Sequence, residues 1–308
     1  MKQRKYQMLT ILGPTASGKT TVGAHAAQRI DGEIISADSR QIYRGMDLGT
    51  GKDYKDYEID GQKIPYHLID TVDAGFEYNV YLYTNAFLKA YEDITSRGKF
   101  PVLCGGSGLY IEAVLNNYQL IQVPKNHKLR KELDDKNLEE LVQILSSYKP
   151  DLHNSTDTEN RRRAIRAIEI EVYLKDHPEL ENELPEINSL IVGVKYDRDN
   201  RRRRITERLK QRLEDGMLDE VQRLLDSGLK PEQLTYYGLE YKYLTLHLTG
   251  ELSYDEMFKK LEIAIHQFAK RQMTWFRRME KNGTTIHWLD GFMPLEEKIA
   301  QIEEMLDI

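Results

Sequence analysis

The sequence is poor in cysteine and in long apolar runs. Cys104 is the only cysteine among 308 residues, which excludes an internal disulfide framework and a cysteine-based zinc cluster and suits a reducing compartment. No uninterrupted apolar segment approaches the roughly 20 residues that a membrane helix needs. The basic N-terminus precedes only a short apolar run, which is typical of a first strand and not of a signal peptide. We therefore expect a cytoplasmic protein that does not enter a membrane.

The chain also lacks a strong excess of one charge. It has 44 Lys and Arg against 50 Asp and Glu, a net charge of -6, which argues weakly against nucleic-acid binding. The distribution of charge matters more than its sum, and cations cluster at 161–166, 201–204 and 270–278. Solvated helix faces balanced by acidic neighbours remain the simpler interpretation of any single cluster.

Short apolar segments alternate with helical patterns in the first part of the chain. We predict strands at 8–12, 33–37 and 100–104, and helices at 20–29 and 79–97. Such alternation predicts a parallel sheet with the functional residues at the carboxyl ends of the strands.

The character of the sequence changes near residue 120. Residues 126–148 are rich in Lys, Glu and Leu and predict helices outside the sheet, 175–188 predicts a loop, and 190–194 returns to a strand. We predict an α/β fold: a P-loop parallel-sheet core formed by residues 1–119 and 186–308, with a mostly helical insertion at 120–185 and a helical C-terminal third.

Two long helices are predicted in the C-terminal third. From Arg204 onward, apolar residues recur at three- and four-residue steps as far as Leu224, and Gly228 is a plausible end. Ser253 and Glu256 fit a capping box before a second helix. That helix is expected to pack one apolar side, made of Phe258, Leu261, Ile265, Phe268 and Met279.

The segment GPTASGKT occupies residues 13–20, directly after the first predicted strand. The backbone amides of such a turn and the positive end of the following helix point at one spot, where phosphates bind. Gly13 and Gly18 permit close approach, Lys19 supplies a fixed charge, and the Thr20 hydroxyl is placed to hold Mg2+. An ordinary glycine-rich turn is the weaker alternative. The loop alone does not specify which molecule carries the phosphates.

Two further strand ends carry polar side chains. Asp38 ends the second strand, where a carboxylate can ligate metal or accept a proton from a nucleophile, although a cap of the next turn by Asp38 or Ser39 is the structural alternative. Ser107 follows a double glycine and suits contact with phosphate or substrate, a turn, or a helix cap equally well. The third strand ends in Cys104 without the metal-binding acid that is usual in NTP-hydrolysing enzymes.

Cations and large aromatic residues mix in the segment KRQMTWFRR at 270–278. Arginine binds phosphate and aromatic faces stack on bases. At this helical spacing we favour a core role for Trp275 and Phe276, and phosphate contact for some of the cations.

Taken together, these motifs resemble the tRNA dimethylallyltransferase family. The matching segments occur in order along the chain: GPTASGKT at 13–20, SADSRQIYRGMDLGT at 36–50, PYHLID at 65–70, GGSGLYI at 105–111, RRRAIRAIEI at 161–170, RITERLKQRLEDGMLDEV at 204–221 and FAKRQMTWFRR at 268–278.

The resemblance implies transfer of a dimethylallyl group from dimethylallyl diphosphate to the exocyclic amine of an adenine next to the anticodon in tRNA, by a Mg2+-dependent monomer. Asp38 matches the general base, and Ser107 matches a Thr at the active centre. The diphosphate would be held by Gly13, Pro14, Thr15, Ala16, Ser17, Gly18, Lys19 and Thr20 with Arg271, and Thr20 would also hold the metal. The segments matching tRNA contacts are Asp38, Ser39, Arg40 and Gln41, together with Arg162, Arg163, Ala164, Ile165 and Arg166.

One segment departs from the family pattern. The family usually has a Gly-Tyr-Lys run with an arginine or another polar residue before it, which helps hold the diphosphate. Residues 236–242 read YYGLEYK, with Glu240 in the place of the glycine and no arginine, so this contact would fall to Arg271. Three alternatives stay open: prenyl transfer to a free adenine nucleotide, a small-molecule P-loop kinase, and a non-catalytic RNA-binding protein with an inert loop. The arginine clusters and the helical insertion disfavour the first.

Overall fold

The computed structural model describes residues 5–118, 120–148, 158, 160–177 and 185–307. The chain divides into two compact units, one formed by Met1–Tyr118 with Pro185–Ile308 and the other by Gln119–Leu184. Both predicted boundaries lie within one residue of this division. Among the described residues, every helix is too short or too polar to traverse a bilayer.

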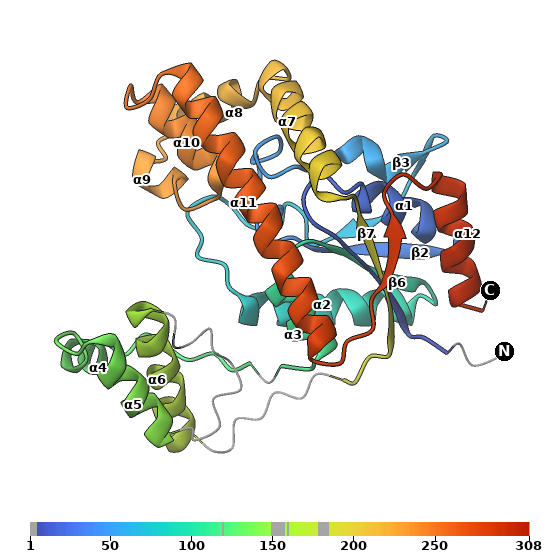
Figure 1. Ribbon diagram of the computed structural model, residues 1–308. Helices are drawn as coiled ribbons and strands as arrows, with labels where there is room; N and C mark the ends of the chain where they lie inside the picture. Colours follow the sequence, from blue (N-terminus) through green and yellow to red (C-terminus); the bar gives the residue numbers. More distant parts are fainter. Residues whose placement is uncertain (1–4, 119, 149–157, 159, 178–184, 308) are drawn as a thin grey trace. The chain divides into compact units, whose positions relative to one another are not determined.

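The first unit is built on a six-stranded parallel sheet (Figure 1). Its order is β5-β2-β6-β1-β7-β8, and Leu9 of the central strand β1 lies beside both Val102 and Leu190. The strands are β1 Met8–Leu12, β2 Gly32–Ala37, β5 Tyr66–His67, β6 Phe100–Gly105, β7 Ser189–Lys195 and β8 His287–Asp290. The four predicted strands are thus confirmed. The edge strands β5 and β8 were missed because two and four residues are too few to show a pattern.

Helices cover both faces of this sheet, which explains why β1, β2 and β6 are buried along their whole length. On one face pack α1 Lys19–Arg29 and α12 Leu295–Met305. On the other pack α2 Val80–Ser96, α3 Gly108–Leu115 and the second half of α11 Tyr254–Lys281. A 3-10 helix at Tyr54–Tyr57 and the short hairpin of β3 Glu58–Ile59 and β4 Gln62–Lys63 complete the N-terminal half.

A separate helical layer packs around the first half of α11 and the buried Tyr241. It consists of α7 Arg198–Glu214, α8 Met217–Asp226, α9 Pro231–Leu234 and α10 Leu239–Leu248. The prediction of one helix from Arg204 to Gly228 is wrong: α7 begins at Arg198, capped by Asp197, and the chain breaks at Gly216, whose φ of 96° ends one helix before the next begins.

Helix α11 begins as the sequence predicts. Ser253 and Glu256 form the capping box, and Leu261, Ile265 and Met279 are buried. Phe268 is the exception to the predicted apolar side, because it lies on a flank of α11 that faces a cavity and remains 38% exposed. Phe276 is in the core as predicted.

The second unit is a small helical bundle of α4 His127–Glu132, α5 Leu138–Tyr148 and α6 Arg161–Asp176, so the helices predicted at 126–148 are confirmed. Its core contains Leu141, Leu145, Ala164 and Ile168. The loop predicted at 175–188 begins later than expected, since α6 continues to Asp176; residues 178–184 lie outside the described residues.

A buried carboxylate, that of Glu33, links strands β2 and β5 at the edge of the sheet to the end of α2 through hydrogen bonds. Glu33 at the start of β2 accepts hydrogen bonds from Arg97, the C-cap residue of α2, and lies 2.8 Å from Nε2 of His67 in β5. The bond from Arg97 is the main cause that lowers the pKa of Glu33 from 4.5 to about 2, against the opposing effect of burial. An ionised Glu33 therefore stabilises the fold fully above pH 4.5, and this contribution is lost as the pH falls toward 2.

Glu33→Gln should lower the free energy of unfolding at pH 7 by about 2 kcal/mol, since it removes a charged hydrogen-bond acceptor whose partner Arg97 is partly open to solvent. The difference from the parent protein should narrow as the pH drops below 4.5. Urea denaturation at several pH values measures both effects, with the exposed Glu58→Gln as control. A deficit that stays constant with pH would show that the charge of Glu33 is not responsible.

Candidate active site

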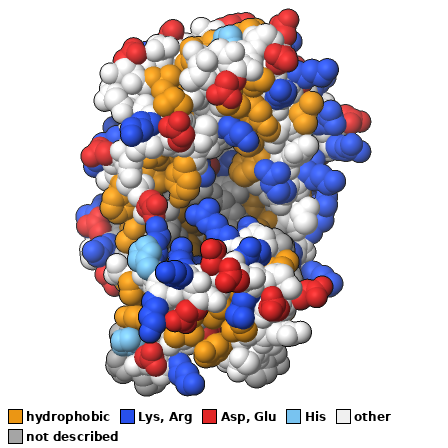
Figure 2. Space-filling model, turned by 90° about the vertical axis from the view of Figure 1, so that its left-hand side faces the viewer, with side chains coloured by type: hydrophobic (Ala, Val, Ile, Leu, Met, Phe, Trp, Pro, Cys, Tyr) orange, Lys and Arg blue, Asp and Glu red, His pale blue; other side chains and the backbone are white. Residues whose placement is uncertain are grey.

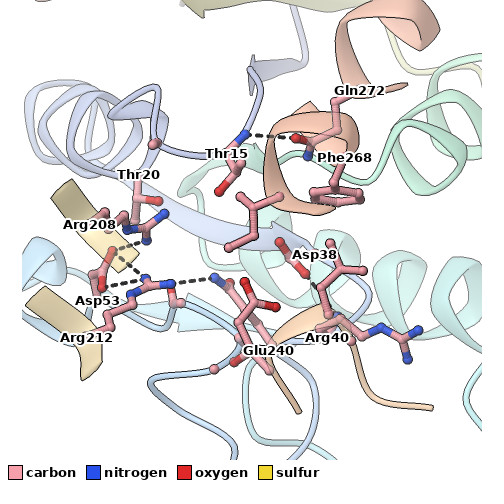
Figure 3. A pocket seen from close by; sticks show the side chains of 18 of the residues that line it. Thr15, Thr20, Asp38, Arg40, Asp53, Arg208, Arg212, Glu240, Phe268 and Gln272 are labelled. Carbon is pink, nitrogen blue, oxygen red and sulfur yellow. Dashed lines mark hydrogen bonds and ion pairs between the residues drawn. The ribbon is translucent and has the colours of Figure 1, made fainter. Parts of the chain in front are cut away.

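A cavity of about 810 Å³ opens at the carboxyl ends of β1, β2 and β6. This volume suits a small-molecule site. Its walls come from the first unit alone: the loop after β1 with the start of α1, parts of residues 38–56 after β2, Ser107 after β6, residues 235–238 before α10, and parts of α7, α10 and α11. Figure 3 shows that its labelled side chains come from segments far apart in the sequence.

The GPTASGKT loop connects β1 to α1 in the way the sequence predicts. Gly18 occupies the N-cap position of α1 with a φ of 78° and offers no side chain to cap the helix. A Cβ at Gly13 would lie 2.6 Å from the backbone oxygen of Val194, so only glycine fits there. The uncapped start of α1 leaves backbone N–H groups directed at the cavity, as an anion site requires.

Two side chains from the C-terminal third hold this loop in place. The backbone N–H of Thr15 donates to Oε1 of Gln272 at 2.8 Å, and Nε2 of Gln272 donates to the Gly106 carbonyl at 2.9 Å. Nε of Arg204 donates to the Ala16 carbonyl at 3.1 Å. Gln272 therefore ties the loop after β1 to the loop after β6. Sequence reasoning missed this role, since it assigned the 201–204 cluster no function and considered only the cations and aromatics of the 270–278 segment.

Lys19 is a cation that its surroundings do not fully compensate. Burial lowers the pKa of Lys19 below its ordinary value, while Cys104 and Asp38 act in the opposite direction. A bound anion at this position would restore the balance in favour of the charged amine.

Asp38 and Ser107 lie at the same edge of the sheet, as predicted. Oδ1 of Asp38 accepts from the Arg40 N–H at 3.0 Å, so Asp38 caps the following turn, as the alternative to a chemical role predicted. The same side chain also lines the cavity (Figure 3). Ser107 is the N-cap residue of α3, but its hydroxyl makes no cap. It accepts instead from the Ser39 N–H at 3.0 Å, so it joins the loop after β6 to the loop after β2.

Gln41 has an internal role in the same region. Its Nε2 donates to the Gly51 carbonyl at 3.1 Å, and its Oε1 accepts from the Ser36 hydroxyl at 3.1 Å. The Gln41 side chain therefore fixes the chain that borders the cavity, and its contact with RNA stays a prediction.

Glu220 of α8 fixes the next stretch of the cavity wall. Its buried carboxylate accepts from the backbone N–H groups of residues 47–49 at 2.8 to 3.0 Å and from the Tyr241 hydroxyl at 2.7 Å. A buried acid with four donors is well compensated, so Glu220 is a positioning residue and not a chemical group of the cavity.

An ion-pair cluster forms another wall. Asp53 accepts from Arg208 and, at 3.1 Å, from Arg212, both of α7 (Figure 3). Burial favours the neutral acid, yet the two arginines keep the pKa of Asp53 below its ordinary value. No local pattern in the sequence indicates this cluster, because the two arginines are 155 and 159 positions from Asp53.

Glu240, the residue that departs from the family pattern, lines the cavity beside this cluster. Burial raises its pKa, and Arg212 and Arg208 oppose that effect. Arg271 also lines the cavity, with its guanidinium 5.8 Å from the Phe268 ring centre. The predicted diphosphate residue is therefore at the cavity, and its contact with diphosphate stays a prediction.

Several side-chain oxygens are available to a cation, although no group of three or more His, Cys, Asp or Glu in the described part of the chain is arranged to chelate a metal. The cavity presents the Thr20 hydroxyl and the carboxylates of Asp38, Asp53 and Asp56, and its lining also includes the carboxylates of Glu207 and Glu240. This set fits Mg2+, which keeps several waters and takes further oxygens from a phosphate ligand.

The arginine run of the second unit divides into two kinds of position. Arg162 and Arg163 are exposed at the start of α6, and Ile165 is half-buried. Ala164 is fully buried in the core of the bundle, and Arg166 pairs with Glu169 and donates to the Val123 carbonyl at 2.8 Å. Ala164 therefore packs the helix and has no surface for RNA, which corrects its place among the predicted contacts. RNA contact by the others stays a prediction.

Comparisons with known proteins agree with this architecture. The family model described as IPP transferase matches residues 41–279. The tRNA dimethylallyltransferase 2 of Bacteroides fragilis strain YCH46 is 61% identical over 99% of both chains, and the protein of that name from Porphyromonas gingivalis strain W83 is 56% identical over 97% of this chain and 98% of its own.

Among solved structures, the tRNA isopentenylpyrophosphate transferase of Bacillus halodurans has a TM-score of 0.72 and 31% identity, covering 98% of this chain and 96% of its own. The chain therefore belongs to the IPP transferase family, an enzyme family of tRNA dimethylallyltransferases.

Proposed function

We propose that the protein transfers the dimethylallyl group of dimethylallyl diphosphate to the exocyclic amine of an adenine next to the anticodon of tRNA. The observation that carries this proposal is the meeting of an anion-binding loop and a carboxylate, Asp38, in one cavity at the ends of β1 and β2, the two strands on either side of β6. Membership of the family and the names of the relatives support it.

The loop after β1 serves the leaving group. In the reaction the bond between the allylic carbon and the diphosphate oxygen breaks, and negative charge develops on the diphosphate. Lys19 and the backbone N–H groups at the start of α1 face the position where this charge appears. Because they are held in place before the substrate arrives, they stabilise the leaving group without reorganisation.

Asp38 serves the nucleophile. As the adenine nitrogen forms its bond to the allylic carbon, it must lose a proton, and a carboxylate within reach accepts it. The hydrogen bond from the Arg40 N–H orients one oxygen of Asp38. We assign Ser107 to the positioning of this loop through Ser39, with its hydroxyl close enough to the chemistry to contact substrate.

Thr20, together with a neighbouring carboxylate, would hold Mg2+ in this scheme. When bound, the ion would neutralise part of the charge on the departing diphosphate. The residues of the cavity still perform the binding and orientation, and Asp38 still takes the proton.

The acceptor must present its adenine outside a base stack, which is least costly in a loop. The basic side chains would supply salt-sensitive contacts to the backbone of the RNA. On the face drawn in Figure 2, Lys and Arg side chains lie among hydrophobic and acidic ones. We also propose, as the resemblance to the family implies, that the enzyme acts as a monomer and works in the cytoplasm with its tRNA substrate.

Incubation with radiolabelled dimethylallyl diphosphate and an unmodified tRNA transcript should label the RNA and release one pyrophosphate per group transferred. A parallel reaction with AMP should give no product, and ATP should not be consumed with or without metabolites. Labelling of AMP but not of tRNA would show that the acceptor is a free adenine nucleotide. Consumption of ATP that depends on a metabolite would favour a kinase.

Asp38→Asn should lower kcat by about 10²- to 10⁴-fold, because the amide cannot accept the proton. The amide oxygen can still accept from the Arg40 N–H, so the turn should persist. Single-turnover kinetics and tRNA binding by filter retention measure the two effects separately, with Asp255→Asn at the exposed start of α11 as control. If Asp38→Asn keeps the single-turnover rate of the parent enzyme but binds tRNA poorly, the role of Asp38 is structural.

A further inference from the structure

Two large aromatic side chains remain exposed at the cavity. Tyr236 is 49% exposed and Phe268 38% exposed, and both line the cavity wall. Because the Tyr236 side chain lines the cavity wall and is also half-exposed, its ring lies at the mouth of the cavity, in contact with solvent.

Arg40 lies over the face of the Tyr236 ring, with the guanidinium carbon 5.1 Å from the ring centre. The backbone N–H of Arg40 is the one that donates to Asp38, so the same residue connects the ring to the predicted base. Within the described ranges, no carboxylate lies within 4.0 Å of the Arg40 guanidinium, in contrast to Arg208 and Arg212, which share Asp53. The charge of Arg40 is therefore available to an anion from outside.

The Tyr236 ring rests on a rigid base. The neighbouring ring of Tyr237 lies 5.6 Å away in an edge-on arrangement and is only 3% exposed. Tyr237 in turn packs 4.7 Å from Tyr43, and its hydroxyl accepts from the Gly75 N–H. Because its base is fixed by packing and a hydrogen bond, Tyr236 presents a flat surface at little further cost in entropy.

A flat ring beside a free cation recognises a particular chemistry. Aromatic faces stack on unpaired bases with little preference for sequence, and a guanidinium binds the phosphate of the same nucleotide. The allyl group of the donor could pack on the ring, but it offers nothing to the adjacent cation, and its diphosphate belongs at the loop after β1. The combination therefore favours a nucleotide of the acceptor RNA.

We propose that Tyr236 and Arg40 form a nucleotide clamp at the mouth of the cavity. Tyr236 stacks on an unpaired base adjacent to the target adenine, and Arg40 contacts the phosphate between them. The clamp rests on the proposed function, and it goes further by naming the group that holds the flanking nucleotide while Asp38 acts on the adenine.

The test compares Tyr236→Ala, Tyr236→Phe and the parent enzyme in steady-state transfer to an unmodified tRNA transcript. Loss of the ring should raise KM for tRNA roughly tenfold, with KM for dimethylallyl diphosphate unchanged within twofold. Tyr236→Phe should keep the parent values, since it keeps the stacking face. Tyr254→Ala is the matched control, because Tyr254 is 46% exposed but lies outside the cavity wall.

A second readout separates stacking from a loss of fold. We use an anticodon stem-loop that carries 2-aminopurine beside the target adenine. The fluorescence of the 2-aminopurine should be quenched when the stem-loop binds the parent enzyme or Tyr236→Phe, and clearly less when it binds Tyr236→Ala. An unchanged KM for tRNA in Tyr236→Ala, or an increase confined to dimethylallyl diphosphate, would overturn the clamp. Absence of transfer by the parent enzyme would instead overturn the proposed function, so the two failures are distinguishable.

Discussion

The structure depends on one electrostatic constraint: a group of positive charge and unpaired backbone N–H groups is held at the tips of parallel strands. Lys19 is desolvated there, and the start of α1 has no capping side chain. Without an anion, burial disfavours the charged form of Lys19. In the proposed function a diphosphate is that anion. Substrate binding and stabilisation of the leaving group would then be consequences of the same arrangement.

Maintaining this arrangement requires contributions from distant parts of the chain. Gln272 and Arg204 hold the loop from the C-terminal third, and Glu220 holds the wall that follows Asp38 through the backbone of residues 47–49. Helix α11 has two functions, since its C-terminal half covers the sheet and residues 265–272 near its middle line the cavity (Figure 1). The helical layer of α7 to α10 thus both lines the cavity and holds its walls in place.

Local features of the sequence were sufficient for the loop after β1, the strand ends and the capping box of α11. They were insufficient where tertiary packing decides. The break at Gly216 interrupts an apolar pattern that continues on both sides, and Phe268 has helical spacing typical of the core although it faces a cavity. The Asp53 cluster joins residues more than 150 positions apart, so no local pattern could show it. Glu240 was noticed only as a departure, and its place beside that cluster became evident from the fold.

The central claim is that the loop after β1 holds the diphosphate while Asp38 faces the reacting carbon. A crystal structure with the unreactive thiolo analogue of dimethylallyl diphosphate tests it most directly. The account predicts diphosphate oxygens within hydrogen-bond distance of Lys19 and the amides of residues 15–20, with the allylic carbon on the Asp38 side of the cavity. Density for the analogue away from this loop, or an allyl group directed away from Asp38, would contradict it.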